Sequence, residues 1–212
     1  MDYAEACVHL IDDDAMVRDC VRAAVVSAGL KFVSYGSAEE FLSSYSQHAA
    51  GPSCALVDVR LPGISGLALQ EKMAQIGCHI PIIMITGYAT VPFVVAAMKA
   101  GADDFLEKPF HRQLLLERVQ KALDRHAGVL RNEAEHDHQD ERAALLTTRE
   151  REVMQLLIDG QSSKEIAASL AISVKTIAKH RARVLEKMEA ENVVDLARRL
   201  SRPPSSATRN GS

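Results

Sequence analysis

Residues 54–66 have the sequence CALVDVRLPGISG, an apolar run that ends at a single aspartate and continues into a turn-rich stretch. The four consecutive apolar residues Cys54–Val57 predict a strand buried on both faces, as in a parallel sheet covered by helices. Asp58 stands where this strand would end. Because ligands of such sheets bind at the carboxyl ends of the strands, Asp58 is a candidate site residue.

The same pattern recurs on both sides of this run. Apolar runs at residues 7–11 and 82–85 predict two more buried strands, and runs at 31–35 and 104–106 predict two weaker ones. Helical periodicity fits the intervals, at residues 15–28, 37–47, 65–75, 90–100 and 111–126. Five successive strand–helix units predict an α/β fold with a doubly wound, five-stranded parallel sheet.

The last third of the chain has no strand-like run, and its helix boundaries are clear. Hydroxyl side chains stand where N-caps are expected, and Gly160 stands where the first helix would end. Three of the expected helices have N-cap candidates, which are Thr148, Ser162 or Ser163, and Ser173, and they end near Ile158, Leu170 and Met188. A fourth helix fits Val193 to Leu200. This part is therefore predicted to be an all-α, four-helix domain.

These patterns divide the chain into four parts. We expect residues 1–126 to form the α/β domain and residues 146–200 the helical domain. The intervening residues 127–145 are polar and acidic, which is typical either of a flexible tether or of a solvated helix that continues the preceding one. Residues 201–212 have the composition of a disordered tail.

The net charge of -3 over 212 residues hides an asymmetry. Residues 1–126 carry 11 basic and 15 acidic side chains, whereas residues 147–212 carry 12 basic and 8 acidic ones. Only the C-terminal part is therefore electrostatically suited to a nucleic acid. No apolar run is long enough for a membrane span and the N-terminus is acidic, so we expect a cytoplasmic protein without membrane partners. The four cysteines are expected to be reduced core residues.

Polar side chains gather at the predicted strand ends. The triplet Asp12, Asp13 and Asp14 follows the first strand, and the later strands are followed by Asp58, Thr86 and Lys108. Clustered carboxylates repel one another unless a cation neutralises them, and an oxygen-only set suits Mg²⁺ or Mn²⁺. A carboxylate can also accept a phosphoryl group. Asp14 is expected to begin a helix rather than to bind metal.

The stretches IDDD, ALVDVRLPGISG, MITG and FLEKPF together resemble the receiver domain of two-component response regulators, over residues 5–126. The resemblance implies a flavodoxin-like sheet of order 2-1-3-4-5, with Asp58 as the phosphoacceptor. It implies a metal site formed by Asp12, Asp13, Asp58 and the backbone carbonyl of Arg60. It also implies that Thr86 is the switch hydroxyl, that Lys108 contacts the phosphoryl group, that Phe105 changes rotamer, and that Lys108-Pro109 is cis.

The stretch LTTREREVMQLLIDGQSSKEIAASLAISVKTIAKHRARVLEKM resembles the LuxR-type helix-turn-helix output domain of FixJ-type regulators, over residues 146–200. The resemblance implies that Ala178, Lys179 and Ala182 face the bases. Residues near the DNA backbone would be Lys164, Ser173, Lys175 and Thr176, and Arg183 would add positive charge. The chain departs from the common pattern at Ala178 and in its ending AENVVDLARRL. His136 and His138 in the acidic stretch are not assigned to a metal site.

Three functions are compatible with these features. In the first, a sensor histidine kinase phosphorylates Asp58, and a homodimer then binds an operator in double-stranded DNA, with RNA polymerase as a further candidate partner. In the second, a ligand or partner protein controls a DNA-binding regulator without phosphorylation. In the third, the protein is a Mg²⁺-dependent phosphatase or phosphotransferase, but Arg60 stands where the acid/base carboxylate would be needed. We expect the first, with slow autodephosphorylation and no other enzymatic activity.

Overall fold

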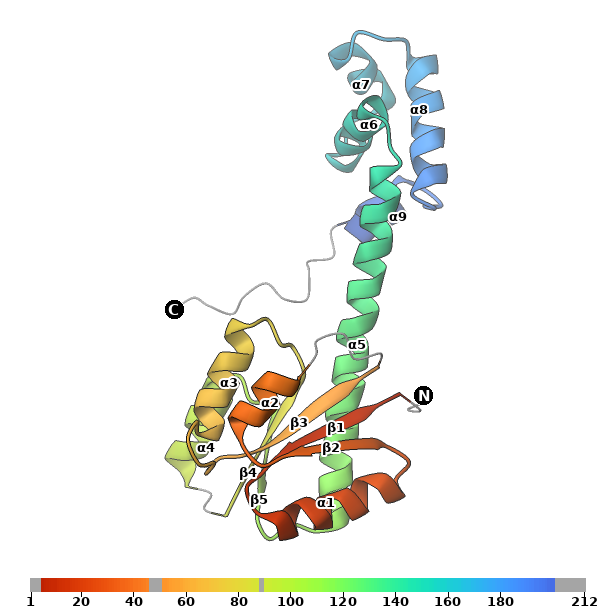
Figure 1. Cartoon of the computed structure of the whole chain (residues 1–212). Helices are drawn as coiled ribbons and strands as arrows, with labels where there is room; N and C mark the ends of the chain where they lie inside the picture. Colours follow the sequence, from red (N-terminus) through yellow and green to blue (C-terminus); the bar gives the residue numbers. More distant parts are fainter. Residues whose placement is uncertain (1–4, 46–50, 88–89, 201–212) are drawn as a thin grey trace. The chain divides into compact units, whose positions relative to one another are not determined.

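The computed structural model describes residues 5–45, 51–87 and 90–200 (Figure 1). Contacts divide the chain into two compact units, Met1–Leu130 and Arg131–Ser212, which are described separately. The predicted disordered tail, residues 201–212, lies outside the described residues. Among the described residues, no helix is both long and apolar enough to span a bilayer.

The first unit contains a parallel five-stranded sheet of order β2-β1-β3-β4-β5, which confirms the predicted α/β fold and strand order. Its strands are Cys7–Ile11 (β1), Lys31–Tyr35 (β2), Ser53–Asp58 (β3), Ile82–Thr86 (β4) and Asp104–Glu107 (β5). Its helices are Ala15–Ser27 (α1), Ala38–Ser44 (α2), Gly66–Gln75 (α3), Val91–Lys99 (α4) and the start of Arg112–Ala144 (α5).

Helices cover both faces of the sheet, as the continuous apolar runs require (Figure 1). On one face, residues of α1 and α5 such as Val21 and Val119 pack with Leu56 of β3. On the other face, Phe41 of α2 and Leu69 of α3 pack in a second cluster. Residues of β3 alternate between the two clusters, so the whole strand is buried.

The strand register aligns the strand ends that carry the polar residues. Ile11 of β1 is opposite Val57 of β3, and Asp58 is opposite Ile85 of β4. Thr86 is opposite Glu107 of β5. The residues that follow these positions therefore emerge at one edge of the sheet, where the candidate site lies.

The second unit is helical and contains Thr148–Ile158 (α6), Ser163–Ser169 (α7), Val174–Lys187 (α8) and Val193–Leu200 (α9), in addition to the residues of α5 from Arg131 onward. The predicted linker, residues 127–145, is thus helical as far as Ala144. This is one of the two alternatives that the sequence left open.

Side-chain caps define the ends of these helices. The N-cap of α6 is Thr147 and not the predicted Thr148, because Thr147 accepts the backbone N–H of Glu150 while the Glu150 carboxylate accepts that of Thr147. Ser162 forms the same reciprocal cap with Glu165, and Ser173 caps α8. Such caps each stabilise a helix by about 1 kcal/mol.

Two small cores hold the second unit together. Ile166 and Ala167 of α7 pack with Ile177 of α8, the recognition helix that carries the residues predicted to face the bases. Val184 belongs to the other core, with Leu146 and Met188, because it lies two turns further along α8. The small Ala167 allows α7 and α8 to approach closely.

All four cysteines are free, but their predicted burial is only partly correct. Cys54 and Cys78 are buried, and Cys7 is half-buried. Cys20 is exposed on α1, since the apolar residues around it in the sequence are not its neighbours on the helix surface.

Candidate phosphoacceptor site and nucleic-acid interface

Four strands bring polar side chains to one edge of the sheet. Asp12 directly follows β1, Asp58 ends β3, Thr86 ends β4, and Lys108 directly follows β5. Asp12, Asp58 and Thr86 are buried, and the side chain of Lys108 is 20% exposed. Buried carboxylates need compensation, so their partners decide what this site can do.

Lys108 bridges the two buried carboxylates. Its Nζ lies 2.6 Å from Oδ2 of Asp12 and 2.5 Å from Oδ2 of Asp58. The backbone N–H of Lys108 also donates to the carbonyl of Thr86 at 2.7 Å, which fixes the start of the loop. The Lys108-Pro109 peptide bond is cis, as predicted. The ammonium group is therefore placed beside the carboxylate that was predicted to accept a phosphoryl group.

The carboxylates of Asp12, Asp13 and Asp58 form a candidate cation site. One oxygen from each lies within 4.8 Å of the other two, with Asp13 exposed and its two partners buried. The donors are all oxygens, and the site is partly open to solvent through Asp13. These features fit Mg²⁺, which keeps several waters and binds phosphate oxygens.

Arg60 lies next to this cluster in the loop after β3. Its backbone N–H donates to Oδ1 of Asp58 at 2.9 Å, so the loop turns back on the aspartate. This contact orients the Asp58 carboxylate. The predicted role of the Arg60 carbonyl as a metal ligand stays a prediction.

The electrostatics of the site depend on the balance between burial and ion pairing. Burial raises the pKa of Asp12 because the charged form loses its hydration, and the hydrogen bond from Lys108 opposes this effect without cancelling it. Burial by itself would lower the pKa of Lys108, but its bonds to Asp12 and Asp58 outweigh burial and raise it. Lys108 therefore stays positively charged and can pair with an anion in addition to these two carboxylates.

Two further residues support the site, and the sequence analysis did not single them out. Arg18 of α1 donates from Nη1 to the carbonyl of Asp12 at 2.7 Å. Gly66 begins α3 so close to Asp58 that a Cβ built on it would lie 2.3 Å from the Asp58 carbonyl oxygen. The only sequence signals were an arginine one turn after the aspartate triplet and a glycine at a predicted helix start.

Asp14 and Phe105 occupy distinct environments near the site. Asp14 is the N-cap of α1, where its side chain accepts the N–H of Met16, in agreement with the prediction that it begins a helix. Phe105 of β5 is half-buried against the core that includes Met84. The rotamer change predicted for this side chain stays a prediction.

The predicted DNA-binding residues of α8 have the spacing of one helix face. Ile177 and Val184 turn inward from α8, while Lys175, Ala178, Lys179, Ala182 and Arg183 are exposed. Lys164 of α7 and Ser173 are exposed, and Thr176 is half-buried. The Ser173 hydroxyl lies 2.8 Å from that of Thr176 and also caps α8, so these two hydroxyls are tied to the helix N-terminus.

Each of the two units matches a known protein family. A family model described as the response regulator receiver domain matches residues 8–120, and one described as bacterial regulatory proteins of the luxR family matches residues 144–200. The chain is 40% identical to the transcriptional regulatory protein FixJ of Azorhizobium caulinodans over 191 residues, 90% of each chain. It is also 40% identical to nodulation protein W of Bradyrhizobium diazoefficiens over 196 residues, 92% of this chain and 85% of the relative.

Solved structures show the same likeness. The response regulator StyR superposes with a TM-score of 0.80 and 34% identity, covering 94% of this chain and 100% of StyR. Full-length FixJ from B. japonicum superposes with a TM-score of 0.56 and 37% identity, covering 91% of this chain and 94% of that one.

Proposed function

The chain belongs to the FixJ-type two-component response regulators, which are transcription factors, and we propose that phosphorylation of Asp58 switches its binding to DNA. The family consists of regulators and not of phosphotransferases. Control by a ligand or partner without phosphorylation, the second function considered above, is not favoured by these matches.

The observation that carries the proposal is the position of Lys108 between Asp12 and Asp58. A histidine kinase would donate the phosphoryl group, and a carboxylate oxygen of Asp58 would form the new P–O bond. Lys108 would then pair with the added phosphoryl oxygens, since its raised pKa keeps it charged. Its contacts with both carboxylates support this role.

A divalent cation completes the proposed site. Asp12, Asp13 and Asp58, with the Arg60 carbonyl, would hold Mg²⁺ or Mn²⁺. When bound, the ion neutralises charge that builds up on a transferring phosphoryl group. The buried Asp12 positions the site through its backbone contact with Arg18, while the exposed Asp13 borders the solvent.

Phosphorylation of Asp58 would change the positions of side chains on β4 and β5. Thr86 ends β4 beside Glu107 of β5, and Phe105 lies two residues earlier on β5, opposite Met84. Movement of the Thr86 hydroxyl toward the phosphoryl group would open space that Phe105 enters. The altered surface would favour a homodimer, and two DNA-binding units would then bind adjacent half-sites of an operator. RNA polymerase is the further partner that we propose for the bound dimer.

Replacement of the phosphoacceptor tests this function. We expect Asp58→Asn to abolish labelling by the kinase or by acetyl phosphate. We also expect beryllofluoride, an acyl-phosphate mimic, to lose its effect on both the elution volume in size-exclusion chromatography and the affinity for operator DNA. Asp19→Asn, the same change at an exposed position of α1, should behave like the unaltered protein. Equal responses of Asp58→Asn and the unaltered protein to beryllofluoride would exclude the phosphoryl switch.

The DNA-contacting surface is tested by the salt dependence of binding. We expect Lys175→Ala to weaken operator binding and to reduce the slope of log affinity against log salt concentration by about one, because one cation placed near the DNA backbone is lost. Lys72→Ala removes an exposed lysine from α3 of the first unit and serves as the control. A Lys175→Ala variant that keeps both the affinity and the slope would place the DNA surface elsewhere.

A further inference from the structure

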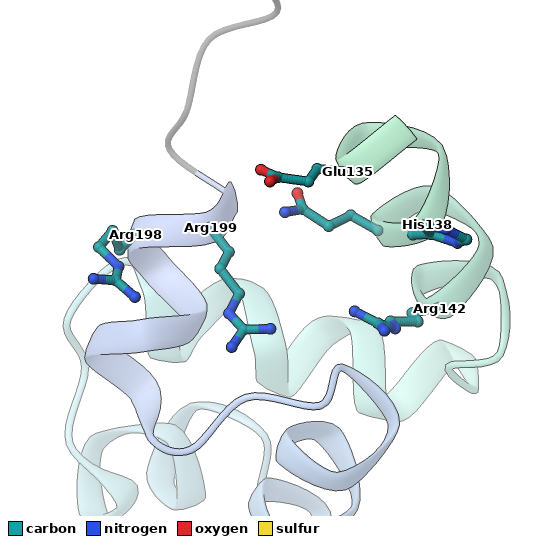
Figure 2. A pocket seen from close by; sticks show the side chains of 6 residues that line it. Glu135, His138, Arg142, Arg198 and Arg199 are labelled. Atoms are coloured by element: carbon teal, nitrogen blue, oxygen red, sulfur yellow. The ribbon is translucent and has the colours of Figure 1, made fainter. Parts of the chain in front are cut away.

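Two sequence features have no role in the function described above, and the fold brings them together within the second unit. One is the histidine- and acid-rich part of α5, and the other is the Arg198-Arg199 pair of α9. The residues of these two segments line a cavity of about 740 Å³ (Figure 2). The lining residues are Glu135, His138, Gln139, Arg142, Arg198 and Arg199.

The lining of the cavity contains more basic than acidic side chains, and each arginine is paired with a carboxylate, Arg142 with Glu189 and both Arg198 and Arg199 with Asp195. Three of its six lining residues are arginines and one is an acid. Figure 2 shows the side chain of Arg142 extending into the space from α5 and that of Arg199 extending toward it from α9, with Glu135 at the opposite end. The Arg142 and Arg199 side chains are only 29% and 35% exposed, whereas Arg198 is 79% exposed. Arg142 and Arg199 are therefore the two cations that the cavity partly shields from water.

Existing ion pairs use only part of the donor capacity of these two arginines. Arg142 contacts Glu189 at 2.5 Å, and Arg199 contacts Asp195 at 2.8 Å. A guanidinium has five N–H donors, and one contact with a carboxylate oxygen leaves others available. Ordinary surface pairing explains why each arginine has a carboxylate partner, but it does not explain why both side chains converge on one hollow.

We propose that this cavity binds a small anion with at least two acidic groups, either carboxylates or phosphoryl groups. Arg142 and Arg199 each hold one acidic group, because a planar guanidinium matches the oxygen pairs of both chemistries. The Gln139 amide adds a hydrogen-bond donor, and Glu135 limits the charge density that the cavity accepts. The volume is in the range of sites for small molecules.

The position of the cavity connects its occupancy to the DNA-binding helices. Arg142 pairs with Glu189, the residue that follows the C-cap of α8. Leu196 of α9 packs with Met188 in the core shared with Leu146. An anion in the cavity therefore binds to Arg142, whose ion pair with Glu189 connects it to the C-terminal end of the recognition helix α8. This site acts in addition to the phosphoryl switch and does not depend on it.

Calorimetric titration of the full-length protein tests the proposal, with citrate and pyrophosphate as separate probes at constant ionic strength. Chelator is present, so that no divalent cation carries either probe to the aspartate cluster. We expect saturable binding of at least one probe, and the responding probe distinguishes carboxylate from phosphoryl recognition. Arg142→Gln and Arg199→Gln should each weaken binding by about tenfold, the usual effect of losing a charge-assisted hydrogen bond. Arg198→Gln, at the exposed neighbouring position, should change it by less than about threefold.

A gain of affinity provides the second test, because loss alone could follow from a damaged fold. Glu135→Gln removes the acid of the lining and should strengthen binding of the responding probe. Lys108→Ala should leave binding unchanged, since Lys108 belongs to the other unit. The proposal is overturned if neither probe binds saturably, if binding survives both arginine substitutions, or if Lys108→Ala removes it.

Discussion

Gly66→Ala is expected to destabilise the first unit by about 3 kcal/mol or more, the upper part of the range for overpacked cores. A Cβ at this position would lie 2.3 Å from the carbonyl oxygen of Asp58 and 3.0 Å from Cα of Val59. Both are backbone atoms, so no side-chain rotation relieves the clash. Helix α3 must move away from the end of β3, which also stretches the hydrogen bond from the Gly66 N–H to the Val59 carbonyl.

The Gly66 effect can be measured by urea unfolding of the full chain followed by tyrosine fluorescence. All four tyrosines precede residue 89 and the chain has no tryptophan, so this signal reports on the first unit alone. The matched control is Gly128→Ala in α5, where a Cβ meets no atom within 4 Å. Alanine at this helical position should stabilise by about 0.5–1 kcal/mol. Equal effects of the two substitutions would show that the close approach of α3 to Asp58 does not exist in solution.

His9 is expected to make the first unit lose stability in mild acid. The imidazole of this β1 residue is buried among Tyr35, Phe41 and Tyr45, with ring centroids 5.6 to 6.0 Å away. Its Nδ1 lies 3.2 Å from the Tyr35 hydroxyl, and its buried Nε2 has no hydrogen-bond partner. A protonated ring would place an unpaired positive charge there, so burial lowers the pKa of His9 from 6.5 to about 4.

The sign of the pH dependence follows from this lowered pKa. The unfolded chain takes up the proton near pH 6.5, whereas the folded chain takes it up only near pH 4. Stability is therefore complete above about pH 7 and falls as the pH decreases from 6.5 to 4. The loss amounts to about 3 kcal/mol, at 1.36 kcal/mol for each pKa unit.

Comparison with a variant that cannot titrate isolates this contribution. His9→Leu should flatten the decrease in unfolding free energy between pH 7 and pH 4, measured by the same tyrosine signal. The control His111→Gln removes an exposed histidine and should keep the full decrease. His126 contributes in the same direction, because burial also lowers its pKa and its Nδ1 accepts the Ser53 N–H at 2.8 Å. If His9→Leu kept the decrease of the unaltered protein, another group would be responsible.

Local patterns in the sequence were sufficient to predict the fold. Continuous apolar runs predicted three of the five strands and weaker patterns predicted the other two, and capping residues such as Ser162 and Ser173 predicted helix starts in the second unit. These signals are local, since burial on both faces selects apolar runs and a helix terminus needs a partner for its N–H groups. The candidate site could be predicted for the same reason, because the residues that follow parallel strands lie at one edge of the sheet.

Other features depend on residues that are distant in the sequence. Lys108 reaches Asp12 and Asp58 across separations of 96 and 50 residues, and no local pattern specifies which carboxylate oxygens it contacts. The choice of Thr147 over Thr148 as N-cap depends on a reciprocal bond with Glu150, and Glu150 is held in turn by Lys187 of α8.

The sequence by itself thus determined which elements form, in which order, and which side chains stand at the strand ends. Only the tertiary structure decided what surrounds them: the aromatic rings around His9, the backbone against Gly66, and the arginines that converge from α5 and α9. The physical reason is that hydrophobic periodicity and capping act over a few residues, whereas desolvation, close packing and charge pairing depend on neighbours that only the folded chain brings together.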